Sequence, residues 1–366
     1  MYKVMAKDLK TLLDSIWKQK ELWNFRVDGM SNESIDCNCP LENKIQKFFE
    51  LTGKERPSNS LLQNLPTIDV KRKQHIYNIF FLGIAIYNDS AIIKDNIDRE
   101  LDKYQKALRA HCDSRFPFVW FLIALYHDLG YSIEKKKSSQ YQSYENLIEE
   151  NGNLGRRDGV PELYESMIKR YFEYRMSGIY KGEKKKDLGI VAGHAMYHDL
   201  CEIRSEKKKT CKKALLWVKD LEEIYNLAAW VVTCHNMFFA NADDICNICR
   251  YERAHLFGLM KEPQEYKIHF HDFPLFFLLC LVDNIEFVKR QDDINENSSE
   301  DLLQQIEYSL NDTEGYISLT VNVQDKELRK KIQDQISGIG NWLTKVVQEK
   351  ENQETTYRIY FNNKEK

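Results

Sequence analysis

Two histidines and two aspartates lie within or at the ends of strongly apolar segments, where charged and metal-binding side chains are uncommon. They are His75, the adjacent pair His127 and Asp128, and Asp283. An ionised carboxylate in an apolar segment is costly to bury unless it is paired or binds a metal, so these surroundings favour ligation. Imidazole and carboxylate ligands suit divalent transition metals such as manganese, iron, cobalt, nickel or zinc. The sequence therefore predicts a buried metal site built from these four residues.

Each candidate ligand is predicted to lie on or beside a core helix. Residues 116–126 are apolar on every side of a helix, which indicates a buried helix, and this run ends directly before the His-Asp pair. A second apolar run, residues 273–282, ends directly before Asp283. His75 opens a third segment, in which apolar residues recur at intervals of three and four, as an amphipathic helix requires. We therefore expect the four side chains to face one cavity.

A His, a later His-Asp pair and a distant Asp form the signature of the HD superfamily of metal-dependent phosphohydrolases, and the chain resembles this family over residues 69–290. The most specific parts of the resemblance are residues 120–134 (WFLIALYHDLGYSIE) and residues 274–290 (PLFFLLCLVDNIEFVKR). A second His-Asp dipeptide, His198-Asp199, leads into a polar, lysine-rich stretch and is interpreted as a chance copy. The resemblance implies a helical HD domain and a site that hydrolyses phosphate esters or anhydrides.

The implied reaction agrees with the chemistry of the ligands. A bound divalent metal lowers the pKa of its water and polarises a phosphoryl oxygen. Asp128 is the candidate bridge between two ions, because an aspartate can bind two metals through its two oxygens, and Asp128 and His235 are the predicted catalytic residues. The predicted substrate is a small phosphorylated molecule, a nucleotide or cyclic nucleotide. Two alternatives stay open, namely an HD-type diiron oxygenase and a ligand-sensing or scaffolding HD protein without turnover.

The number of metal ions, one or two, depends on further histidines. His235 ends the apolar run of residues 227–234, in a setting like that of His127, and is predicted to bind a second metal or the substrate phosphate. Two-metal members of the family commonly carry another His before a Gly at a helix start, and in this chain Leu188 stands at that place. His194 is the weaker second candidate, because an offset of six residues rotates it well away on a helix.

Charge and composition restrict the partners and the compartment. Lys135, Lys136 and Lys137 follow the His-Asp pair by a few residues and are candidates for phosphate binding. The net charge of -3 provides no global basic field, which argues against a general nucleic-acid binder. Nine cysteines without a hydrophobic targeting segment favour the reducing cytoplasm over a disulfide framework. No apolar run reaches the roughly twenty residues of a membrane span, and oligomerisation is left open.

The chain is predicted to have three parts, with a fold that is mainly α. These are residues 1–66, an N-terminal helical cap and linker; residues 67–295, the HD domain; and residues 296–366, a C-terminal α/β appendage. Within the appendage, residues 316–323 and 355–361 alternate apolar and polar side chains like strands. Residues 326–349 between them have a helical pattern that two glycines interrupt. The expected architecture is an HD-domain helical core with a small strand-helix-strand appendage.

Overall fold

The computed structural model describes most of the chain, in segments separated by short gaps. The described residues are 3–24, 70–106, 115–130, 133, 141–155, 162–177, 187–210, 218–240, 244–260, 269–288, 296–351 and 354–361. All structural statements below concern these residues. The predicted loop of residues 29–40 and the predicted helix of residues 41–51 lie outside them.

The described chain is mainly helical, which confirms the predicted fold class. The helices are α1 (Leu9–Lys18), α2 (Lys20–Trp23), α5 (Val70–Asp89), α6 (Ala91–Asp102), α8 (Arg115–Tyr126), α10 (Tyr144–Asn151), α11 (Glu162–Met176), α12 (Leu188–Thr210), α13 (Leu221–Cys234), α14 (Ile245–Arg253), the 3-10 helix η3 (Phe257–Leu259), α15 (Pro274–Ile285), α16 (Glu296–Gln304) and α17 (Lys326–Trp342). The strands are β1 (Lys3–Asp8), β2 (Ile306–Asn311), β3 (Tyr316–Val321), β4 (Val346–Glu351) and β5 (Glu354–Tyr360).

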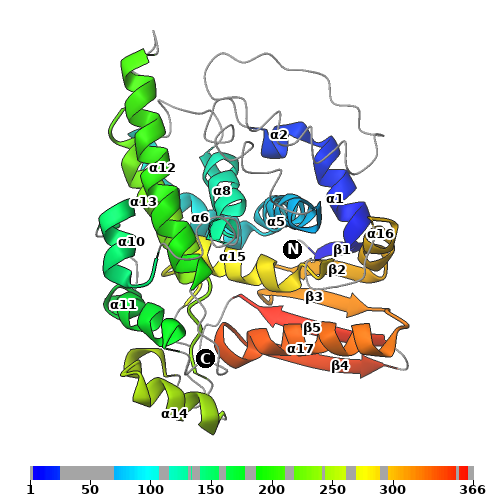
Figure 1. Cartoon of the computed structure of the whole chain (residues 1–366). Helices are drawn as coiled ribbons and strands as arrows, with labels where there is room; N and C mark the ends of the chain where they lie inside the picture. The colour runs from blue at the N-terminus through cyan, green and yellow to red at the C-terminus, as the bar shows by residue number, and fades with distance from the viewer. Residues whose placement is uncertain are drawn as a thin grey trace.

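The helical core surrounds two short helices that have almost no polar face. In α8 every residue from Phe116 to Tyr126 is buried, and in α15 every residue from Pro274 to Asp283 is buried. Helices that are apolar all round need neighbours on every side, and α8 packs against α5, α6, α12, α13 and α15. Figure 1 shows α5, α8 and α15 at the centre of the molecule, with α12 and α13 running beside them. The ends of these central helices therefore lie inside the protein.

A five-stranded antiparallel sheet lies at one side of the helices (Figure 1), in the order β1-β2-β3-β5-β4. The two predicted strands are confirmed as β3 and β5, which pair along their whole length. Three further strands were not predicted. β1 comes from the N-terminus of the chain and pairs with β2, a contact between residues about 300 positions apart that local alternation cannot indicate.

Helix α17 joins the sheet to the helical core. It contacts both β4 and α15, and its buried side chains are Ile332, Ile336, Ile339 and Trp342. The helix continues through both glycines and ends at Trp342, so residues 346–349, which were predicted to continue it, belong to strand β4. Burial of the apolar face of α17 offsets the cost of about 1 kcal/mol that each interior glycine imposes on a helix.

The N-terminal helix is confirmed near its predicted position, as α1 followed by α2. Trp17 and Trp23 stack with ring centroids 5.3 Å apart, and both rings meet the edge of Phe81 on α5. Among the described helices, no single one is long and apolar enough to cross a bilayer. The segment Gln74–Asp89 and α6, bent by 105° relative to each other, meet that test of length and composition only as a pair.

Candidate metal centre

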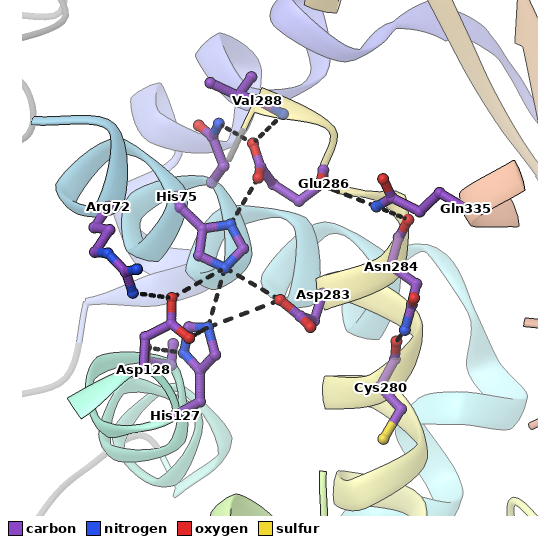
Figure 2. A network of polar contacts seen from close by, with 12 residues as sticks. Arg72, His75, His127, Asp128, Cys280, Asp283, Asn284, Glu286, Val288 and Gln335 are labelled. Atoms are coloured by element: carbon purple, nitrogen blue, oxygen red, sulfur yellow. Dashed lines mark hydrogen bonds and ion pairs between the residues drawn. The ribbon is translucent and has the colours of Figure 1, made fainter. Parts of the chain in front are cut away.

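The four predicted ligands come from three helices that pack against one another. His75 lies in the second turn of α5, His127 and Asp128 directly follow α8, and Asp283 lies near the end of α15. Contacts of α5 with α8 and with α15 bring these helix ends together, and all four side chains are buried. Figure 2 shows their polar groups pointing toward one another.

The distances between the donor atoms are short. His75 Nε2 lies 3.1 Å from His127 Nε2 and 3.1 Å from Asp283 Oδ1. Asp128 places Oδ2 3.9 Å from His75 Nε2 and Oδ1 3.8 Å from His127 Nε2. Ligand atoms of His75, His127 and Asp128 all lie within 4.8 Å of one another. The structure therefore brings His75, His127 and Asp128 into one group, and Asp283 Oδ1 lies beside it, 3.1 Å from His75 Nε2 and 3.9 Å from His127 Nε2.

This donor set fits a transition metal. Two imidazole nitrogens bound to one ion at about 2.0–2.1 Å are roughly 2.9 Å apart in octahedral and roughly 3.3 Å apart in tetrahedral coordination. The 3.1 Å between the Nε2 atoms of His75 and His127 lies within this range. His127 Nδ1 donates a hydrogen bond to the carbonyl of Ala124 at 2.7 Å, because a carbonyl can only accept. In the neutral ring, the lone pair of His127 is therefore on Nε2, which faces the other candidate ligand atoms. A buried group of this kind can hold a metal ion.

A buried glutamate that the sequence analysis missed extends the cluster. Glu286 Oε2 lies 2.6 Å from His75 Nδ1, and Glu286 Oε1 accepts hydrogen bonds from Asn78 Nδ2 at 2.8 Å and from the Val288 backbone N–H at 3.2 Å. The available signal was its spacing, because a residue three positions after Asp283 lies on the same side of a helix. Like Asp283, Glu286 lies among apolar residues, where a carboxylate is expected to be paired or to bind a metal.

Arg72 is the second residue that the sequence analysis missed. It lies three positions before His75 on α5, so it shares the face of the helix that carries the ligand. Its guanidinium Nη1 is 3.6 Å from Asp128 Oδ2, and its side chain is 22% exposed whereas that of Asp128 is 4% exposed. Arg72 is thus a partly exposed cation in contact with the cluster, and its guanidinium group is suited to bidentate contact with an anionic oxygen pair.

His235 is buried beside the cluster, next to His127. It follows α13 directly, and its ring meets that of His127 edge-on with centroids 5.7 Å apart. Its Nδ1 donates to the carbonyl of Val232 at 2.5 Å, which leaves the lone pair on Nε2. His235 therefore lies next to His127, and its role as a second-metal or substrate ligand stays a prediction.

The start of α12 lies between the His-Asp turn and His235. A Cβ on Gly130 would come within 2.2 Å of the Leu188 carbonyl oxygen, and a Cβ on Gly189 would lie 3.1 Å from the His235 ring, so both approaches depend on glycine. Leu188 therefore stands beside the site, where a metal-binding histidine was expected, and its side chain has no ligand atom. Before it, Asp187 accepts from the Ile190 backbone N–H at 2.9 Å, and burial raises the pKa of its carboxyl.

The remaining predicted residues lie elsewhere or outside the described segments. His194 is buried, but Nδ1 contacts the Gly152 carbonyl at 3.0 Å and Nε2 contacts Tyr144 Oη at 3.4 Å. Burial lowers the pKa of His194 to about 4, and its role as a second ligand stays a prediction that these contacts do not favour. In the second His-Asp dipeptide, His198 is half-exposed and pairs with Glu202 at 3.5 Å. Lys135, Lys136 and Lys137 lie outside the described residues.

Comparison of the chain with models of protein families, with curated proteins and with solved structures gives no match.

Proposed function

We propose that the protein is a metal-dependent phosphohydrolase that cleaves a phosphate ester or anhydride, with a nucleotide or cyclic nucleotide as substrate. The observation that carries the proposal is the buried group of His75, His127 and Asp128, whose ligand atoms lie within 4.8 Å of one another, with Asp283 Oδ1 3.1 Å from His75 Nε2. HD-type phosphohydrolases use this combination of residues, and the order in which they occur in this chain resembles theirs.

Four residues would hold the metal, namely His75, His127, Asp128 and Asp283. Bound by these residues, a divalent ion would supply Lewis-acid activation of a phosphoryl oxygen and a water of lowered pKa, which is the chemistry that phosphoester hydrolysis needs. The fully buried walls of α8 and α15 exclude bulk water, and in such surroundings electrostatic interactions are stronger than in solvent.

The neighbouring side chains have separate tasks in this proposal. Arg72 binds a phosphoryl oxygen through its guanidinium, because this partly exposed cation contacts Asp128 at the edge of the cluster. Asp128 orients the attacking water by accepting a hydrogen bond at its carboxylate, a role that its position between Arg72 and the two histidines supports. His235 acts through Nε2, which takes a proton from the attacking water and passes it to the leaving oxygen, or, once protonated, binds the substrate phosphate.

The depth of the site supports a small substrate. The side chains of His75 and His127 are 0% exposed and that of Asp283 is 12% exposed, so a bulky polymer backbone would need a large rearrangement to reach them. A phosphate group on a nucleotide can enter as a terminal group. The chain's net charge of -3 also supplies no general attraction for nucleic acid.

Purified protein should be assayed against nucleoside triphosphates, cyclic nucleotides and simple phosphoesters, with its metal content measured in parallel. We expect activity to vanish with a chelator, to return with manganese, and to release phosphate or a nucleoside monophosphate at equal rates with and without dioxygen. Consumption of dioxygen during turnover would instead identify the diiron oxygenase. Metal binding without turnover across the panel would identify a sensor or scaffold.

A further inference from the structure

We propose that Glu286 is a positioning residue, which fixes the tautomer of His75 so that the Nε2 lone pair of this ring points into the metal cavity. The role rests on the proposed function in that His75 is taken as a metal ligand. The Glu286 carboxylate lies on the side of His75 opposite the cavity, behind the proposed metal ligands. It also connects the metal centre to the C-terminal sheet and its helix α17.

The tautomer follows from the donors that surround the carboxylate. Glu286 Oε1 receives two N–H groups, from Asn78 at 2.8 Å and from the Val288 backbone at 3.2 Å, and Oε2 lies 2.6 Å from His75 Nδ1. An ionised carboxylate only accepts hydrogen bonds, and 2.6 Å is typical of a charge-assisted one. His75 Nδ1 must therefore carry a hydrogen, and in the neutral ring this leaves the lone pair on Nε2, the atom that faces His127 Nε2 and Asp283 Oδ1 at 3.1 Å each.

Three elements hold Glu286 in this position. Asn78 lies three residues after His75 on α5, so both side chains share one face of the helix. From this face the His75 ring contacts one oxygen of the Glu286 carboxylate and the Asn78 amide contacts the other. The Val288 backbone N–H belongs to the turn that follows α15. From α17, Gln335 Nε2 donates to the carbonyl of Asn284 at 2.5 Å and lies 3.4 Å from that of Glu286 (Figure 2). The α17 helix thus secures the segment that carries both Asp283 and Glu286.

Replacement of Glu286 by Gln separates this role from simple packing. Gln has nearly the same shape, and its Oε1 can keep the hydrogen bonds from Asn78 and Val288. Its amide NH₂ would then face His75 Nδ1 and could only donate, so the ring hydrogen would move to Nε2. The lone pair would be lost from the cavity while the volume of the core stays the same. Partners of this kind behind metal-binding histidines are worth about 10- to 100-fold in metal affinity.

The test combines two measurements on Glu286→Gln. Nitrogen-15 NMR of metal-free, histidine-labelled protein reports the tautomer of each of the nine histidines, with the His75 signal identified by its loss in His75→Gln. Calorimetric titration with zinc reports affinity. We expect the Nδ1–H tautomer in the wild type, the Nε2–H tautomer in Glu286→Gln, and about 10- to 100-fold weaker zinc binding in the variant. The matched control is Glu100→Gln, which neutralises a buried glutamate on α6, a helix without ligands, and should leave both readouts unchanged.

An unchanged His75 tautomer in Glu286→Gln, or zinc affinity within twofold of the wild type, would overturn the proposal. If Glu286→Gln does not fold, Asn78→Ala removes one hydrogen-bond donor from the Glu286 carboxylate. This variant should bind zinc several-fold more weakly and retain the Nδ1–H tautomer of His75. Wild-type zinc affinity in Asn78→Ala would also overturn the proposal. The tautomer of His75 is measured without metal or substrate. A protein without hydrolytic activity would therefore refute the proposed function, while the tautomer measurement would still test the role of Glu286.

Discussion

Replacement of Asp128 by Asn should remove most of the stabilisation of the protein by metal. The wild-type carboxylate lies within 3.9 Å of His75 Nε2 and 3.8 Å of His127 Nε2, and Asn keeps its shape but removes the charge. At a metal concentration of 100 times Kd, binding stabilises the folded state by about 2.7 kcal/mol. An unfolding entropy of about 2.1 cal/mol/K per residue over 366 residues converts this into a rise in Tm of about 3.5 °C for the wild type.

Loss of a direct ligand should lower the affinity by at least the roughly 100-fold that outer partners can cost. At the same metal concentration the variant would then gain only about 0.4 kcal/mol, which is a shift of about 0.5 °C. Thermal unfolding with and without manganese measures both values. Asp199→Asn in the second His-Asp dipeptide is the matched control and should keep the full shift. A full shift in Asp128→Asn, or its loss in Asp199→Asn, would refute the assignment of ligands.

Two further predictions concern the other buried histidines. His235→Ala should slow hydrolysis about 10²- to 10⁴-fold, with the metal content unchanged, if His235 moves a proton. A fall from two bound metals to one would instead identify His235 as a second-metal ligand. Wild-type activity in the variant would exclude both roles. The pKa of His194 is about 4 in the folded protein, below the 6.5 of a free histidine. As the pH falls, the unfolded chain therefore binds a proton at this residue before the folded protein does. The free energy of unfolding should decrease between pH 6.5 and 4 by up to about 3 kcal/mol. Urea unfolding of wild type and His194→Gln at pH 7.5 and 4.5 checks this, since the variant should lack that part of the decrease.

The elements that carry the ligands were predictable because their signals are local. A run such as residues 116–126, apolar on every side, can only be a buried helix in a folded protein of this kind, and the structure shows α8 there. The strands β3 and β5 likewise follow from alternation within a few residues. Strand β1 was not predictable, because its six residues become a strand through pairing with β2 at the other end of the chain.

Within the site, the ligand types were visible in the sequence and their surroundings were not. Arg72 and Glu286 carry no motif of their own, and each becomes recognisable only through its distance from Asp128 or His75. His194 and His235 occupy similar apolar segments, and the crossing of α12 with α13 decides that one faces Tyr144 and the other His127.

The sequence by itself determined a mainly helical fold and a set of four residues whose charge makes their burial costly unless they are paired or bind a metal. Residue type and period decide both, because they act over a few positions along the chain. The packing of α5, α8 and α15 decided that both carboxylates lie within 4 Å of the two imidazole Nε2 atoms, and that Glu286 lies behind His75. Those contacts join residues as far apart as 211 positions, and only the three-dimensional arrangement of helices sets such distances.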